Sequence, residues 1–200
     1  MKRLIAILSL SLMLIPALAQ NHTDYQLPET PQRAEYIDFP SLDKGFWFAA
    51  QLSPAAAFAA DGSRATFVQT DIILGYRFGE FFKIGAGVAP RLVIPINSNT
   101  SMGFPPARIA VGERSGIDIP IIIDLRGNII SQESRMCVPY WNVDAGYTIG
   151  QGIYASPTLG IRIGQPRNNF IAGLTYMFQY YGGARAVPAH AFGIRLGFEY

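Results

Sequence analysis

The sequence is poor in the side chains from which disulfides, metal sites and catalytic centres are built. Its 200 residues include one cysteine, Cys137, and two histidines, His22 and His190. A single cysteine cannot close an internal disulfide, and no Cys/His spacing suits a zinc ion. The sequence therefore nominates no catalytic, cofactor-binding or metal-binding residue, and we expect neither an enzyme nor a cofactor.

Long apolar runs are also missing, except at the beginning of the chain. Residues 1–19 combine two basic residues, an apolar stretch and a final Ala-Leu-Ala before Gln20. This is the pattern of a cleavable secretory signal peptide, and the stretch is shorter than the ~20 residues that a spanning helix needs. We predict an exported protein whose mature chain crosses no membrane by helices.

Charge is scarce and evenly balanced. Charged residues make up 15% of the chain, whereas 50% of it is hydrophobic. Loss of Lys2 and Arg3 with the signal peptide leaves fourteen basic against fourteen acidic residues. A neutral chain lacks the basic stripe that nucleic-acid binding requires, so no nucleic-acid partner is expected. An apolar chain without spanning helices is either a soluble domain with a large core or a barrel that faces lipid.

What the sequence does contain is an alternation of period two. In residues 192–200, Phe, Ile, Leu, Phe and Tyr alternate with Gly, Arg, Gly and Glu. Successive side chains of a strand point to opposite faces, so this pattern indicates a strand between two unlike environments. The pattern recurs in eight runs, at about 45–59, 66–79, 81–95, 117–129, 138–149, 152–164, 168–181 and 192–200.

One face of these runs is large and apolar; the other is mostly Gly, Ser, Thr and Asn with isolated charges. A soluble barrel would present a densely charged face to water, so we predict that the small face points inward. The sequence thus predicts an all-β, eight-stranded antiparallel up-and-down transmembrane β-barrel spanning 45–200. Apolar residues on the small face, such as Trp47 and Ile122, and prolines on the apolar face, such as Pro54, Pro90, Pro139 and Pro157, are exceptions. Each proline is expected at a bulge or a strand end.

Eight strands leave an interior just wide enough for side chains to fill. The charged residues of the inward face are predicted to form a structural network there, because charge in a low-dielectric lumen must be paired. They are Asp71, Arg77, Lys83, Arg91, Asp118, Asp124, Arg126, Asp144, Arg162, Arg195 and Glu199. Glycines on the same face, including Gly75 and Gly85, are expected to make room for the long side chains.

The connections set a predicted orientation. Outer-membrane barrels place short turns on the periplasmic side and longer loops outside, and the long 95–116 connection would then be extracellular. Residues 20–44, which are polar and interrupted by proline, are expected as a periplasmic extension outside the barrel.

Several segments resemble strands of the small outer-membrane β-barrel proteins of Bacteroidetes-type bacteria. They are residues 75–88, 119–128, 144–150, 156–164 and 196–200, and their order along 45–200 is that of the family. The resemblance implies an outer-membrane location and a C-terminal aromatic strand similar to the signal read by the barrel-assembly machinery. It implies no reaction. Tyr200 departs mildly from the family's more usual terminal Phe.

Three functions remain open from the sequence. The favoured hypothesis is an integral outer-membrane protein, in contact with outer-membrane lipid, that displays its loops to an extracellular partner through 95–116. The alternative is a narrow channel for water, ions or small solutes, selected by interior charges. A lipid-modifying hydrolase would need His190 with a nearby serine and acid; a histidine at the membrane interface is the favoured interpretation.

Overall fold

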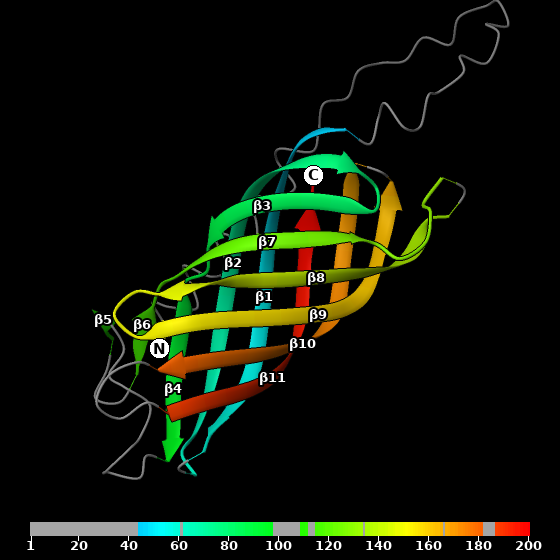
Figure 1. The fold of residues 1–200 in the computed structure, drawn as a ribbon. Coiled ribbons are helices and arrows are strands. Elements are labelled where there is room, and N and C mark those ends of the chain that lie inside the picture. The colour runs from blue at the N-terminus through cyan, green and yellow to red at the C-terminus, as the bar shows by residue number, and fades with distance from the viewer. Residues whose placement is uncertain are drawn as a thin grey trace, which may run out of the picture. The chain divides into compact units, whose positions relative to one another are not determined.

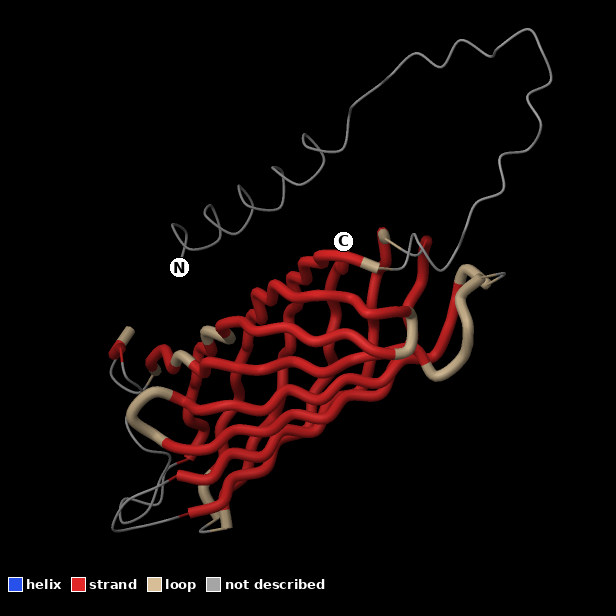
Figure 2. Tube along the Cα trace, turned by 45° about the horizontal axis from the view of Figure 1, so that its top comes forward, coloured by secondary structure: helices blue, strands red, loops and turns tan. Residues whose placement is uncertain are grey.

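The structure is a computed structural model that describes residues 44–60, 62–97, 109–111, 115–133, 135–165, 167–181 and 187–200. The predicted signal peptide at 1–19, nearly all of the 20–44 extension and most of the 95–116 connection lie outside these residues. Regular structure in the described part is strand only (Figure 2). No helix among these residues has the length and apolarity needed to cross a membrane.

The described residues form eleven strands: β1 (Gly45–Ala59), β2 (Arg64–Gly79), β3 (Phe82–Val88), β4 (Arg91–Asn97), β5 (Ile109–Ala110), β6 (Gly116–Asp118), β7 (Pro120–Asn128), β8 (Cys137–Thr148), β9 (Gly152–Gln165), β10 (Asn168–Tyr181) and β11 (Val187–Glu199). All pairings are antiparallel, and β1 pairs with both β2 and β11. The sheet therefore closes on itself. In Figure 1, β7, β8 and β9 cross in front of the steeper β1 and β2, as tilted strands around one axis do.

The closed ring contains eight strands, because two of them are interrupted. Both β3 and β4 pair with β2 in one continuous register, and β7 and β6 continue that register on the far side. At the interruption, Ala89 N donates to Pro120 O, and Pro90 O accepts from Thr70 N. Pro90 has no N–H of its own to give to the ladder. The short β5 pairs only with β6, outside the ring. The predicted eight-stranded up-and-down barrel is confirmed.

The prediction for the prolines was wrong at two positions. Pro54 and Pro157 lie inside β1 and β9, and the register of those strands is the same on both sides of them. Pairing lapses beside each proline and then resumes, so a missing N–H removes ladder contacts without adding a residue. Pro90 lies at an interruption and Pro139 near the start of β8, as expected.

Burial alternates along the strands as the sequence predicts. Large apolar residues on the outer face are exposed, with Leu174 at 72% and Phe46 at 93%. The small and charged face is buried, and so are the apolar exceptions on it, Trp47, Phe67, Ile73, Val93, Ile122, Ile171 and Met177. An apolar outer surface around a polar interior is the inside-out arrangement of a barrel whose solvent is lipid.

The two ends of the barrel differ. At the terminal end lie Gly45, Tyr200 and the tight β2–β3 turn, while the loop end carries the β1–β2 connection and the ends of β4 and β8. The β7–β8 connection, residues 129–136, is the longer one at the terminal end.

Candidate functional site

The interior of the barrel holds all eleven charged residues that the sequence predicts for it. Each of their side chains is at most 3% exposed. They come from β2, β3, β4, β6, β7, β8, β9 and β11, so every barrel strand except β1 and β10 contributes one or more. Strand periodicity brings them to one face, and closure of the ring then brings distant strands together.

Glu199 is a hub near the terminal end. Its carboxylate accepts from Lys83 Nζ at 2.6 Å, Arg162 at 2.8 Å, Arg77 at 3.2 Å and Arg126 at 3.3 Å. These four cations come from β2, β3, β7 and β9, so one carboxylate ties together strands from around the ring. Arg162 also donates to Asn128 Oδ1 at 2.6 Å.

Arg126 links this hub to the middle of the lumen. Its guanidinium donates one hydrogen bond to each oxygen of the Asp124 carboxylate, with both N···O distances 2.6 Å. It also lies over the ring of Trp47, 4.5 Å from the centroid, a cation–π contact. Asn142 donates to the same Asp124 carboxylate. Bidentate pairing and stacking are the modes in which a buried arginine is best accommodated.

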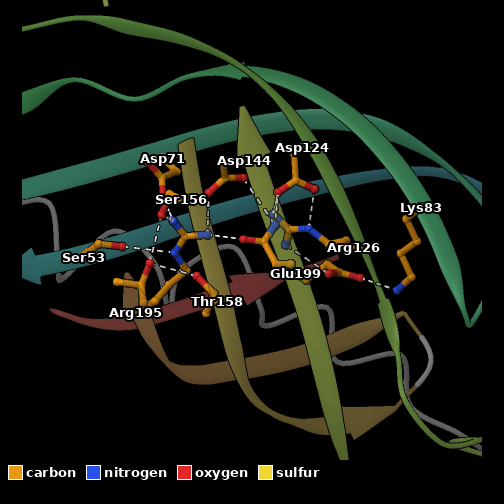
Figure 3. A network of polar contacts seen from close by, with 12 residues as sticks. Ser53, Asp71, Lys83, Asp124, Arg126, Asp144, Ser156, Thr158, Arg195 and Glu199 are labelled. Atoms are coloured by element: carbon orange, nitrogen blue, oxygen red, sulfur yellow. Dashed lines mark hydrogen bonds and ion pairs between the residues drawn. The ribbon is translucent and has the colours of Figure 1, made fainter. Parts of the chain in front are cut away.

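Arg195 occupies the middle of the lumen between two carboxylates. It lies 2.6 Å from Asp144 and 3.5 Å from Asp71 (Figure 3). Its remaining donors reach Ser53 and Ser156, and a further one reaches the side-chain oxygen of Asn142.

Arg91 and Asp118 lie nearer the loop end and are arranged differently. They are cross-strand neighbours in the β4–β6 pair, but no ion pair joins them. Asp118 accepts from Gln151 Nε2 at 2.6 Å. Arg91 donates to Gln179 at 3.2 Å and contacts two aromatic rings. The structure thus brings nine of the eleven predicted residues into two ion-paired groups that Asn142 joins, and it holds Arg91 by a neutral amide and aromatic rings instead.

Neutral residues complete the lumen, and two tyrosines among them were passed over by sequence reasoning. Tyr140 and Tyr154 are fully buried, under the guanidinium groups of Arg162 and Arg91 respectively. Each tyrosine lies two residues before an inward polar residue, Asn142 or Ser156, so strand alternation could have predicted that it faces the lumen. Other inward neutral partners are Ser53, Gln69, Asn128, Asn142, Thr148, Thr158, Thr175 and Gln179.

Glycines make room chiefly for aromatic rings. A Cβ on Gly75 or Gly85 would come within 2.7 to 2.9 Å of the Trp47 ring, and one on Gly160 within 2.8 Å of Tyr140. None of the closest contacts is an arginine or lysine side chain, so the expectation that these glycines make room directly for the long charged side chains was wrong. The glycines seat the aromatic rings on which arginines then stack.

The outer surface carries aromatic groups near both ends. Phe46, Tyr76, Phe78 and Phe82 contact one another toward the terminal end. Toward the loop end, His190 lies among aromatic side chains, and the hydroxyl of Tyr176 is 2.6 Å from its Nδ1. Within the described residues His190 has no other hydrogen-bond partner, so no serine–histidine–acid set is formed. Nor do those residues hold a cluster of three or more potential metal ligands.

A closed eight-stranded ring with an apolar exterior and a polar interior defines a transmembrane β-barrel. No protein-family model matches the chain, and no curated protein sequence matches it. The crystal structure of Neisserial surface protein A is similar, with a TM-score of 0.50 and 17% identity, over 77% of this chain and 95% of that one. At that identity the likeness concerns the fold.

Two further structures are similar at lower scores. The N-terminal β-barrel domain of Pseudomonas aeruginosa OprF has a TM-score of 0.35 and 10% identity, over 75% of this chain and 97% of that one. A de novo designed transmembrane β-barrel has a TM-score of 0.31 and 11% identity, over 74% of this chain and 94% of that one. The narrower Bacteroidetes-type family stays a prediction from the sequence.

Proposed function

We propose that this protein is an integral outer-membrane barrel whose interior is closed by ion-paired side chains and whose role is to hold its loop-end connections rigidly for surface interactions. The observation that carries the proposal is the filled lumen. Glu199 and its four cations occupy it near one end, and Arg195 with its two carboxylates occupies its middle. Such a scaffold is well suited to present binding residues on loops.

Three features support the outer membrane as the location. The outer face is apolar, with aromatic residues near both ends, as girdles at the two membrane interfaces would require. The sequence begins with a predicted signal peptide, and its fold is like that of Neisserial surface protein A. Assembly by the barrel-assembly machinery and a membership in the Bacteroidetes-type family follow as further parts of the proposal.

The side chains that fill the interior also argue against a channel for ions or solutes. A pore needs sites that bind weakly enough for release, whereas here the arginines are held by short contacts to carboxylates, amides and rings. The interior also offers no nucleophile paired with a base among the described residues, so we do not assign an enzymatic activity.

Orientation and display are tested together by epitope tagging of the full-length chain. A tag after Ser101 lies in the long connection at the loop end, and a matched tag after the exposed Glu133 lies at the terminal end. We expect antibody to label the first tag on intact cells and the second only after permeabilisation. Labelling in the reverse order, or fractionation of the protein away from the outer membrane, would contradict the proposal.

Deleting residues 98–113 tests whether the display segment is separable from the scaffold. The deletion removes β5, which pairs only with β6 and lies outside the ring. The variant should still fold to a heat-modifiable form on gels while losing any surface binding that this connection provides. Failure to fold would show that the connection is part of the structural core.

A further inference from the structure

Arg91 differs from the other buried cations of the lumen. Each of the other five has a carboxylate within ion-pair distance, whereas Arg91 has none among the described residues. It donates to Gln179 Oε1 at 3.2 Å and Thr148 Oγ1 at 3.5 Å and lies over the rings of Phe67 and Tyr154. Its cross-strand neighbour Asp118 is not within ion-pair distance. Neutral acceptors and rings do not cancel a buried charge, which is costly without a paired counter-ion.

Two hydrogen-bond donors beside this charge have no acceptor. They are Nε of Arg91 and Nε2 of Gln179, each on a side chain that is 3% exposed. The orientation of the Gln179 amide is fixed, because its oxygen accepts from Thr148 at 2.8 Å and from Arg91. Both side chains line one cavity of about 10 Å³. That volume is of the order that a single small guest, the size of a water molecule, requires.

The rest of the cavity is apolar, with Ala57, Phe67, Val93, Met177 and Ala189 among its walls. A water molecule there would accept from the two donors but would find no strong acceptor for its own hydrogens. The remaining polar residue of the lining, His190, is bonded through Nδ1 to Tyr176. A halide ion only accepts, so it matches a lining of donors.

The net charge of the buried side chains also favours a bound anion. The buried side chains of the described residues include six cations and five carboxylates, Asp118 among the latter. One bound monovalent anion would make the lumen neutral. We propose that the loop-end half of the lumen is a halide site formed by Arg91 and Gln179, with chloride as its physiological class of ligand. This inference rests on the fold and not on the proposed surface role.

Bromide titration of the purified full-length protein in lipid vesicles tests the site. Unfolding in urea is followed by gel mobility at constant ionic strength, with bromide replacing gluconate, which is too large for the cavity. A single site on the folded state should raise the folded-to-unfolded ratio about tenfold for each tenfold increase in bromide above its dissociation constant. No response of the wild-type protein to bromide would overturn the proposal.

Two variants separate this site from general salt effects. Gln179→Glu keeps an oxygen for Thr148 and Arg91 and supplies the missing negative charge covalently, so it should fold and lose the bromide response. Arg64→Gln, at an exposed arginine of the loop end, should respond as the wild type does. A bromide response undiminished in Gln179→Glu would overturn the proposal. If that variant does not fold, Arg91→Met should abolish the response, and a response retained there would have the same meaning.

Discussion

At the scale of single residues, Glu199 is the carboxylate that joins the largest group of ion pairs in the lumen, with four cations around it. It forms ion pairs with four buried cations, Arg77, Lys83, Arg126 and Arg162. Breaking a buried ion pair by removing one partner leaves uncompensated charge and typically costs ~3–5 kcal/mol. We expect Glu199→Gln to lower the free energy of unfolding by about this amount, measured by urea unfolding in lipid vesicles.

The matched control for Glu199 is Glu133, an exposed acid at the same end of the barrel. Glu133→Gln should change the free energy of unfolding by no more than about 0.5 kcal/mol, as surface substitutions usually do. If the two variants were equally stable, the hub would contribute nothing and the description of the lumen as a charge network would be wrong.

Two glycines of β2 provide a second test at this scale. A Cβ on Gly75 would lie 2.2 Å from the carbonyl oxygen of Ile84 and 2.7 Å from Trp47, whereas one on Gly79 would meet nothing within 4 Å. Gly75→Ala should therefore destabilise the barrel by roughly 1–3 kcal/mol through overpacking, and Gly79→Ala should be nearly neutral. Melting of both variants in detergent, followed by circular dichroism, checks this. Equal stability would contradict this account, because the Ile84 backbone as well as Trp47 would have to move aside.

The sequence predicts which side chains face the interior, but it does not predict which of them form ion pairs with one another. Alternation alone assigns Asp71, Arg126 and Glu199 to the inner face, because a strand has only two faces. It cannot show that Arg77 and Glu199, 122 positions apart, meet across the lumen. Tyr140 and Tyr154 were within reach of the same parity argument, since each lies at an inward-facing position of its strand.

At the scale of elements, strand number and order follow from the sequence, whereas the irregularities do not. The interruption of the third strand lies at Ala89–Pro90, where pairing lapses with both neighbouring strands. At Pro54 and Pro157 it lapses with one neighbour only, because Pro54 stays paired with β2 and Pro157 with β8. That is a property of the assembled ring and not of the local sequence.

The outward face of β10 allows a test of whether this strand lies in lipid. Leu174 is 72% exposed near the middle of the strand, whereas Thr175 is 2% exposed and bonded to Ser156 and Thr158. Arginine on the lipid face costs ~2–4 kcal/mol at the bilayer midplane and about 0–1 near the interfaces. Leu174→Arg should show the larger cost and Ile129→Arg, at the terminal end, the smaller, measured by refolding into vesicles.

The control on the inner face of β10 is Thr175→Ser. It retains the hydroxyl and its bonds and should be far milder than Leu174→Arg. Equal tolerance of Leu174→Arg and Ile129→Arg, together with solubility of the protein without detergent, would revive a soluble barrel.

At the scale of the whole barrel, closure of the ring gives eight two-faced strands a polar interior within an apolar wall. The ring closes through the β1–β11 and β1–β2 pairs, so neither terminal strand is left as an edge. Closure also fixes which charges meet, since Glu199 on the last strand accepts from residues of the second, third, fourth and sixth. The central claim is that this network closes the lumen to ions.

Single-channel recording in a planar bilayer tests that claim most directly. Purified full-length protein, shown to be folded by its heat-modifiable mobility, is added to a bilayer in concentrated potassium chloride, with a porin as the positive control. A closed lumen predicts a record without discrete conductance steps. Reproducible steps in the wild-type record whose size or ion selectivity changes in Arg162→Gln would contradict it and would show that ions pass beside Glu199.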